Sequence, residues 1–166
     1  MMGNRILPSM LMVLSSSLSL GGDAPARWTG RCQRAIDGDT ILVKRDRQVV
    51  TVDLAWVDCP ELEQPYGTDA TDFAIRKLEG KIVTVIPESE LSSTVVGRVE
   101  IYGRDYSGLI VAEGLAWYYP RAPADPTLVA AETKARTEGR GLWSDSGPTP
   151  PWIWRQGNRT GLRPYR

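Results

Sequence analysis

The sequence of 166 residues contains no histidine. This absence excludes a Ser-His-Asp hydrolase, a histidine general base, a zinc ion bound by histidine and a histidine that carries a phosphoryl group. Any hydrolytic chemistry in this chain must therefore use carboxylates, arginines and a metal bound through oxygen.

Cysteine is also scarce, since the chain contains only Cys32 and Cys59. Two cysteines are too few for a structural zinc site, which takes four ligands, and their spacing does not form the CxxC motif of redox proteins. In an exported protein they could form one disulfide; otherwise they are two separate buried thiols. The sequence leaves both alternatives open.

An excess of positive charge is missing as well. The chain has 20 basic and 20 acidic residues; removing residues 1–26 takes away one base (Arg5) and one acid (Asp23), which leaves 19 of each. Proteins that bind duplex nucleic acid without sequence preference usually have a strong basic excess. Any affinity of this chain for nucleic acid must therefore be local.

Charges of one sign are nevertheless clustered. Residues 48–75 contain six acids and no base, whereas residues 154–166 contain four arginines and no acid. The acidic stretch would repel phosphate unless a cation lay within it. For Glu63, Asp69 and Asp72, an ordinary solvated loop and helix is the alternative. The arginine tail either contacts nucleic acid or an envelope polyanion, or is a solubilising end of the chain.

The N-terminal residues have the form of a secretory signal. Arg5 precedes a mostly apolar stretch over residues 6–20, and Ala24-Pro25-Ala26 fits a cleavage site. We therefore expect residues 1–26 to be removed on export, so that the protein is secreted or periplasmic; an N-terminal tail is the alternative. The stretch is too short and too rich in serine for a membrane span, and none is expected after processing.

The apolar pattern predicts an α+β domain over residues 27–147, then a Pro- and Trp-rich segment over 148–166 that packs on it in extended form and ends in a loose tail. Strands are expected over residues 28–36, 39–45, 48–57, 81–86 and 94–102. Helices are expected over residues 67–79, 107–113 and 125–138, with Ser107 and Asp125 as N-terminal caps. Five short strands with about three helices indicate an OB-fold-like β-barrel.

Two acidic motifs lie about twenty residues apart, Asp37-Gly38-Asp39-Thr40 and Asp58-Cys59-Pro60-Glu61. The carboxylates of Asp39, Asp58 and Glu61 stand beside turn-forming glycine and proline, at the ends of strand-like runs. Oxygen atoms directed at one point are the ligands that Ca²⁺ and Mg²⁺ prefer. An Asp-Gly pair alone is equally typical of a hairpin turn, so the metal-site interpretation depends on Asp58 as well.

These motifs, and others that follow them, resemble the thermonuclease family, the staphylococcal-nuclease-like proteins. The later motifs are Gln64-Pro65-Tyr66-Gly67, Gly114-Leu115-Ala116-Trp117-Tyr118, Ala131-Glu132 with Ala135-Arg136, Gly141-Leu142-Trp143 and Pro150-Pro151-Trp152-Ile153-Trp154-Arg155. Their order along residues 28–155 is that of the family. The family's fold is an OB-fold barrel, which agrees with the predicted strands.

The resemblance implies a Ca²⁺ site in which Asp39 and Asp58 are carboxylate ligands and the backbone carbonyl of Cys59 is a further ligand. Asp37 would lie just outside the ligands and order the turn. Glu61 matches the family's glutamate that activates the water attacking phosphorus, which a carboxylate can do beside a cation.

The family also uses two arginines, whose guanidinium groups bind the phosphate oxygens. At the first of these positions this chain has Asp53, and losing one preorganised donor typically costs about 10²–10³ in rate. The second position is Arg98 or Arg104. Only nine residues separate Arg104 from Gly114, too few for the expected strand and helix, so we assign the role to Arg98. Arg104 then becomes a substrate-binding candidate in the following loop.

Tyr118 and Tyr119 fall near the tyrosines on which the family stacks nucleotide bases; tyrosines at the edge of the core are the alternative. Trp56, close to Asp58, is expected to narrow the pocket. Together with the signal-like N-terminus, the resemblance therefore implies an exported, monomeric, Ca²⁺-dependent endonuclease that cleaves DNA or RNA, as single strands or frayed duplex, with low sequence specificity. The departure at Asp53 is expected to weaken this activity. The alternative is a weak or inactive OB-fold module that binds nucleic acid or a cell-envelope partner.

Overall fold

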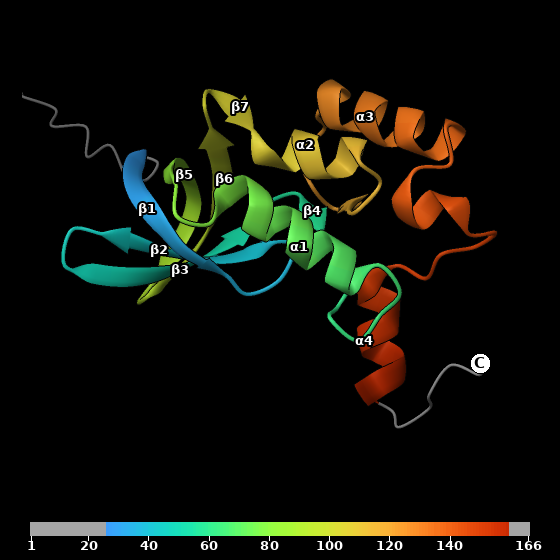
Figure 1. Ribbon diagram of the computed structural model, residues 1–166, viewed down its shortest axis with the longest axis horizontal. Coiled ribbons are helices and arrows are strands. Elements are labelled where there is room, and N and C mark those ends of the chain that lie inside the picture. Colours follow the sequence, from blue (N-terminus) through green and yellow to red (C-terminus); the bar gives the residue numbers. More distant parts are fainter. Residues whose placement is uncertain (1–25, 160–166) are drawn as a thin grey trace, which may run out of the picture.

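A five-stranded mixed β-barrel forms the body of the protein (Figure 1). The computed structural model describes residues 26–159. The barrel strands are β1 (Trp28–Ala35), β2 (Thr40–Arg45), β3 (Gln48–Leu54), β5 (Ile82–Leu91) and β6 (Thr94–Ile101). Neighbouring strands pair antiparallel in the order β3-β2-β1-β5-β6, and a parallel pairing of β3 with β6 closes the barrel. The predicted α+β, OB-fold-like architecture is confirmed.

The alternating apolar residues of the strands fill the barrel, as their period of two requires. Ile41 and Val43 of β2, Val52 of β3, Val85 of β5 and Val99 of β6 are all fully buried. Polar residues of the same strands point outward, so one pattern specifies both the strand type and the core face.

Three helices pack against the barrel strands or against each other: α1 (Gly67–Leu78) packs on β1, α2 (Tyr106–Ala112) packs on β6, and α3 (Pro126–Thr137) packs on α2. Asp125 caps α3 as expected, because its side chain accepts hydrogen bonds from the backbone N–H groups of Thr127 and Leu128. The expected cap of α2 is wrong by two residues. Asp105 accepts from the N–H of Ser107, while Ser107 itself lies buried within the helix.

Short elements join these parts. The two-residue strand β4 (Val57–Asp58) pairs antiparallel with β8 (Trp117–Tyr118), and β7 (Arg104–Asp105) extends the edge of β6. A 3₁₀ turn, η1 (Gly141–Ser144), follows α3. The β4–β8 pairing matters for the site, because it fixes Asp58 against the segment that carries Tyr119.

The chain after Gly147 forms a helix, α4 (Pro151–Arg159), where an extended segment was expected. Pro151 is its first residue, a position that proline favours because a first-turn N–H needs no helical partner. The N–H groups of Ile153 and Trp154 both donate to the carbonyl of Pro150, at 3.0 Å. No helix among the described residues is long and apolar enough to cross a membrane.

Cys32 and Cys59 are both buried and both free thiols, so the disulfide alternative is not realised in this structure. The expected signal peptide over residues 1–26, apart from its last residue, lies outside the described residues, as does the end of the arginine-rich tail from residue 160 onward.

Candidate active site

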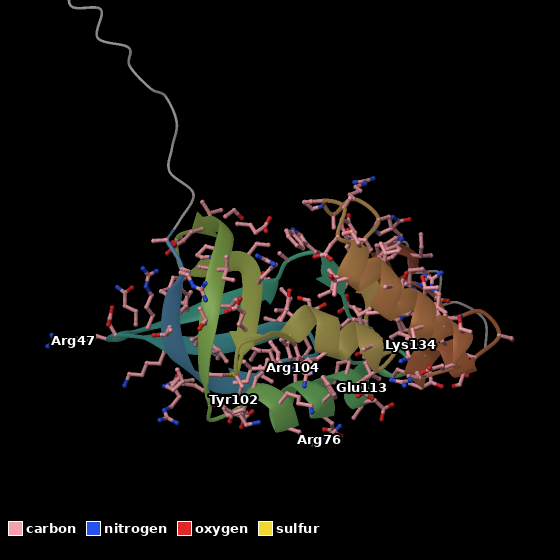
Figure 2. All side chains as sticks on the ribbon, turned by 90° about the horizontal axis from the view of Figure 1, so that it is seen from above. Arg47, Arg76, Tyr102, Arg104, Glu113 and Lys134 are labelled. Carbon is pink, nitrogen blue, oxygen red and sulfur yellow. The ribbon has the colours of Figure 1, made fainter. Side chains whose placement is uncertain are left out.

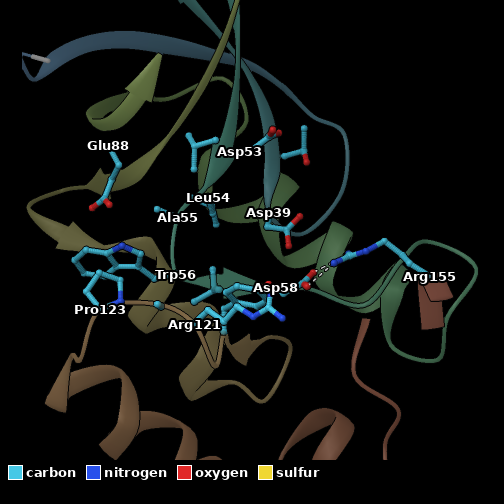
Figure 3. A pocket seen from close by; sticks show the side chains of 15 residues that line it. Asp39, Asp53, Leu54, Ala55, Trp56, Asp58, Glu88, Arg121, Pro123 and Arg155 are labelled. Atoms are coloured by element: carbon cyan, nitrogen blue, oxygen red, sulfur yellow. Dashed lines mark hydrogen bonds and ion pairs between the residues drawn. The ribbon is translucent and has the colours of Figure 1, made fainter. Parts of the chain in front are cut away.

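A cleft of about 560 Å³ lies where the ends of β2 and β3 meet the β4–β8 pair and α4. Figure 3 shows it with its lining side chains. It is lined by Asp39, Thr40, Asp53, Leu54, Ala55, Trp56, Val57, Asp58, Glu88, Val96, Tyr119, Arg121, Ala122, Pro123 and Arg155. Two of the predicted metal ligands, Asp39 and Asp58, therefore line one cavity although they lie 19 positions apart in the sequence.

The first acidic motif forms the turn between β1 and β2. Asp37 Oδ1 accepts hydrogen bonds from the backbone N–H of Asp39 at 3.0 Å and of Thr40 at 2.6 Å, which holds the turn closed. A Cβ on Gly38 would lie 2.8 Å from the sulfur of Cys59 and from the Cβ of Ala70, so only glycine fits there. Asp37 thus orders the turn from outside the cleft, as predicted.

Asp39 is tied to the second acidic motif. Its Oδ2 accepts a hydrogen bond of 2.5 Å from the backbone N–H of Cys59. Burial raises the pKa of Asp39 well above its ordinary value, and the neighbouring carboxylate of Asp37 and then that of Asp58 raise it further. The surrounding protein groups therefore do not fully stabilise the charged form of the Asp39 carboxylate.

Asp58 lies on β4 and is only 8 % exposed. Burial raises its pKa, and Arg155 partly opposes that effect. Within residues 26–159 no three His, Cys, Asp or Glu side chains are grouped closely enough to hold a metal ion. Asp39 and Asp58 nevertheless supply the oxygen donors that a hard divalent cation takes, and such ions complete their coordination with carbonyls, water or substrate oxygens. Asp39 and Asp58, completed by such additional ligands, therefore fit a Ca²⁺ or Mg²⁺ ion.

Glu61 lies in the loop between β4 and α1, and the backbone holds this loop tightly. Its N–H donates to the side-chain oxygen of Gln64 at 3.2 Å, and the Gln64 amide donates to the carbonyl of Thr149. A Cβ on Gly67 would lie 1.9 Å from the carbonyl oxygen of Glu61, so the loop packs directly on the start of α1. The backbone position of Glu61 is therefore fixed by the Gln64 side chain and by packing on Gly67.

Arg155, on α4, contacts both Asp58 and Glu61, and its ion pair with Asp58 is drawn in Figure 3. Its Nη1 and Nη2 donate to Oδ1 and Oδ2 of Asp58 at 3.0 and 2.7 Å, and Nη1 also donates to Oε1 of Glu61 at 2.7 Å. Sequence analysis missed this role because it assigned the arginine to the tail. The signal was available in the motif itself, since Trp152 and Trp154 lie within three positions before Arg155 and can anchor the segment that carries it.

Asp53 lines the same cleft from β3. Its Cα pairs in register with Thr40. Burial raises the pKa of Asp53, and a hydrogen bond from the Thr40 side chain acts in the opposite direction. The cleft therefore carries a third aspartate at the position where an arginine was expected from the family pattern.

Arg98, the expected catalytic arginine, is not among the residues that line the cleft. Its guanidinium lies over the Trp56 ring, 4.8 Å from the ring centroid, and Nη1 is 3.8 Å from Oδ2 of Asp105. Trp56 does line the cleft, with a left-handed backbone (φ 71°) that is uncommon for a bulky residue. The Trp56 ring is therefore the cation–π partner of the Arg98 guanidinium.

The remaining candidates separate clearly. Arg104 is exposed on β7, beside the Tyr102 turn, and does not line the cleft (Figure 2). Tyr118 is used structurally: its hydroxyl donates to the carbonyl of Pro123 and accepts from the N–H of Asp125. Tyr119 does line the cleft.

The structure adds a second positively charged side chain, besides Arg155, that sequence analysis missed. Arg121, exposed in the segment after β8, lines the cleft as well. Nothing in its neighbourhood of the sequence marks it, because its position depends on how this segment folds back after Tyr119.

Comparisons with known proteins identify relatives of this chain. The family model described as staphylococcal nuclease homologue matches residues 51–145, a range that includes Asp58 and Glu61 and ends before α4. A protein of Escherichia coli described as an uncharacterized endonuclease is 40% identical over 128 residues, which cover 76% of this chain and 84% of that protein. The micrococcal nuclease of Shigella flexneri is 31% identical over 148 residues, covering 81% of this chain and 84% of that one. Staphylococcal-like nuclease CAN1 of Arabidopsis thaliana is 31% identical over 128 residues, which are 76% of this chain but 38% of the plant protein.

Proposed function

We propose, from the premise that this chain belongs to the family of staphylococcal nuclease homologues, that it is a Ca²⁺-dependent endonuclease hydrolysing phosphodiester bonds of DNA or RNA with little sequence preference. The observation that carries the proposal is the placement of Asp39 and Asp58 on one cleft, with Glu61 linked to Asp58 through Arg155. The signal-like N-terminus supports export as the setting of this activity.

In this proposal Asp39, Asp58 and the backbone carbonyl of Cys59 hold the cation. A bound Ca²⁺ would offset the negative charge of the cleft, draw phosphate oxygens into it and lower the pKa of an attacking water. The hydrogen bond between Asp39 and the N–H of Cys59 keeps the two acidic motifs in register for this task.

Glu61 acts as the general base. It takes a proton from the attacking water as the water oxygen forms its bond to phosphorus; the opposite P–O ester bond breaks, and the leaving oxygen takes a proton from solvent. The Gln64 side chain and the close packing on Gly67 hold the Glu61 backbone in position for this step.

Low sequence preference follows from the way in which the cleft would contact a nucleotide base. Tyr119 presents an aromatic ring, and stacking on a ring does not depend on base identity. The backbone phosphate and one stacked base would then fix the substrate, preferably as a single strand or a frayed duplex.

One observation favours a second candidate, a module that binds nucleic acid or an envelope partner without cutting. Asp53 adds a carboxylate to the cleft, where phosphate would approach. A pure binder has no need of Asp39, Asp58 and Glu61 together, and for this reason we favour the nuclease.

The test is cleavage of labelled single-stranded DNA and RNA by the chain without residues 1–26, in Ca²⁺ and in excess chelator, beside Glu61→Gln. We expect cleavage that requires Ca²⁺ and collapses in the variant. A folded protein that binds Ca²⁺ but leaves both substrates intact over hours would contradict the proposal and support the binding module.

A further inference from the structure

We propose that Arg155 of α4 binds the substrate phosphate in this cleft and stabilises the charge that develops on it during hydrolysis. This inference rests on the proposed function, and it identifies a catalytic arginine that lies outside the residues matched by the family model.

The cleft needs such a group. Asp39, Asp53 and Asp58 line it together with Glu88, whereas the arginines among its lining residues are Arg121 and Arg155. A phosphodiester entering this cavity meets four carboxylates, and one divalent cation does not neutralise them. An arginine directed at the reacting centre is therefore the second positive group that binding requires.

Of the two arginines, Arg155 lies beside the reacting groups. Its guanidinium bridges Asp58 and Glu61, a metal ligand and the base in the proposed function, through hydrogen bonds of 2.7–3.0 Å. Its side chain is 46% exposed, so a ligand can reach it from solvent. The planar fork that now holds a carboxylate has the geometry to hold two phosphate oxygens instead.

Arg155 is also firmly positioned. The Trp152 ring packs edge-on against Trp117 and Tyr119, with centroids 6.4 and 5.6 Å apart, and Trp154 lines a small cavity together with Gln64 and Trp117. The Gln64 amide holds the carbonyl of Thr149, just before α4. These contacts place α4 at the rim of the cleft, so the arginine is preorganised.

Phosphate binding by Arg155 would also affect the binding of the metal ion. When the guanidinium moves from the carboxylates to a phosphate, Asp58 becomes free to bind a cation and Glu61 becomes free to bind water. Phosphate and cation therefore assist each other's binding through one arginine. No covalent bond changes in this exchange.

The first test compares cleavage rates of Arg155→Ala and Arg155→Lys with wild type, using Arg76→Ala, at an exposed position of α1, as the matched control (Figure 2). We expect kcat to fall by about 10²–10³ in Arg155→Ala, to recover in part in Arg155→Lys, which keeps the charge but not the fork, and to stay unchanged in the control. An unchanged or faster Arg155→Ala enzyme would overturn the proposal, because it would make the arginine a structural pair or an inhibitory latch.

The second test does not depend on cleavage. An eight-nucleotide labelled single-stranded DNA is titrated in Ca²⁺ against Glu61→Gln and against Glu61→Gln with Arg155→Ala, and thermal unfolding of both proteins checks that they are folded. We expect at least about tenfold weaker binding without the arginine, as for loss of a charge-assisted hydrogen-bonded pair. Equal affinity in the two folded proteins would refute the phosphate contact.

A rescue variant distinguishes loss of the phosphate contact from damage to the fold in Arg155→Ala. Asp53 lines the same cleft, so Asp53→Arg combined with Arg155→Ala supplies a guanidinium from β3 instead of α4. Recovery of at least tenfold in cleavage, or in oligonucleotide binding, supports the proposal; a folded double variant with no recovery in either counts against it. If wild type fails to cleave at all, the proposed function fails, and the binding arm still decides the role of Arg155.

Discussion

The backbone N–H of Cys59 donates a hydrogen bond of 2.5 Å to Asp39 Oδ2. This contact joins the β1–β2 turn to the β4 segment, and so helps to hold the two acidic motifs at one cleft. Asp58, the residue before Cys59, then lines the cleft beside Asp39.

Replacing Asp39 by Asn should remove Ca²⁺ binding while keeping an oxygen that can accept the Cys59 hydrogen bond. We expect loss of calorimetric Ca²⁺ binding and a fall in cleavage of at least about a hundredfold, because a charged ligand is lost from the cation site. Asp46→Asn, in the exposed β2–β3 turn, is the matched control and should retain both properties. Full Ca²⁺ affinity in Asp39→Asn would place the cation elsewhere.

The two thiols should be inert in the folded protein. Burial raises the pKa of Cys32 from 9.0 to about 11, and burial together with the Asp39 carboxylate raises the pKa of Cys59 well above its ordinary value. At about pH 8 neither forms the reactive thiolate. We expect an aromatic disulfide reagent to titrate no thiol in native protein and both in denaturant; rapid native reaction would show that one thiol is exposed.

The same pKa shift predicts a dependence of stability on alkaline pH. The folded-state pKa of Cys32 is raised, so its favourable contribution is complete below pH 9.0 and is lost as the pH rises through about 11. The midpoint of urea unfolding should therefore fall over this range, and a Cys32→Ala variant should show a smaller fall. An equal fall in both proteins would assign the effect to other groups.

Gly67→Ala should damage the site through the loop that carries Glu61. The new Cβ would lie 1.9 Å from the Glu61 carbonyl oxygen, and crowding of this kind typically costs about 1–3 kcal/mol. We expect a lower free energy of unfolding together with a lower kcat. Gly108→Ala is the control: a Cβ there meets nothing within 4 Å, and alanine is the better helix former.

The two tyrosines should differ in the property they change. Tyr119→Ala should raise KM, because stacking of one base contributes about 1–3 kcal/mol, while Tyr119→Phe keeps the ring and should behave as wild type. Tyr118→Phe loses the hydroxyl contacts to Pro123 and Asp125, so it should lower stability by about 1 kcal/mol without raising KM. A raised KM in Tyr118→Phe instead would exchange the two roles.

Most of the fold was predictable because its signals are local. The alternation of Ile41, Val43, Val50 and Val52 specifies strands and their inner face within a few residues. The cap at Asp125 is equally local. The helix α4 was missed because its apolar residues, read without the surface that they cover, fit an extended chain as well as a helix.

The sequence by itself determined the chemistry that this protein can use: no histidine, carboxylates in two turn motifs, and an aspartate in place of an expected arginine at position 53. Those are properties of residue type and short spacing. Only the tertiary structure decided which arginine side chains reach the cleft. Arg98 is held by Trp56, and Arg155 reaches Asp58 across 97 positions of sequence. Such contacts follow from how α4 packs on the rest of the domain. The Trp152 ring packs against Trp117 and Tyr119, which places Arg155 one turn further along the helix, and no local pattern encodes that choice.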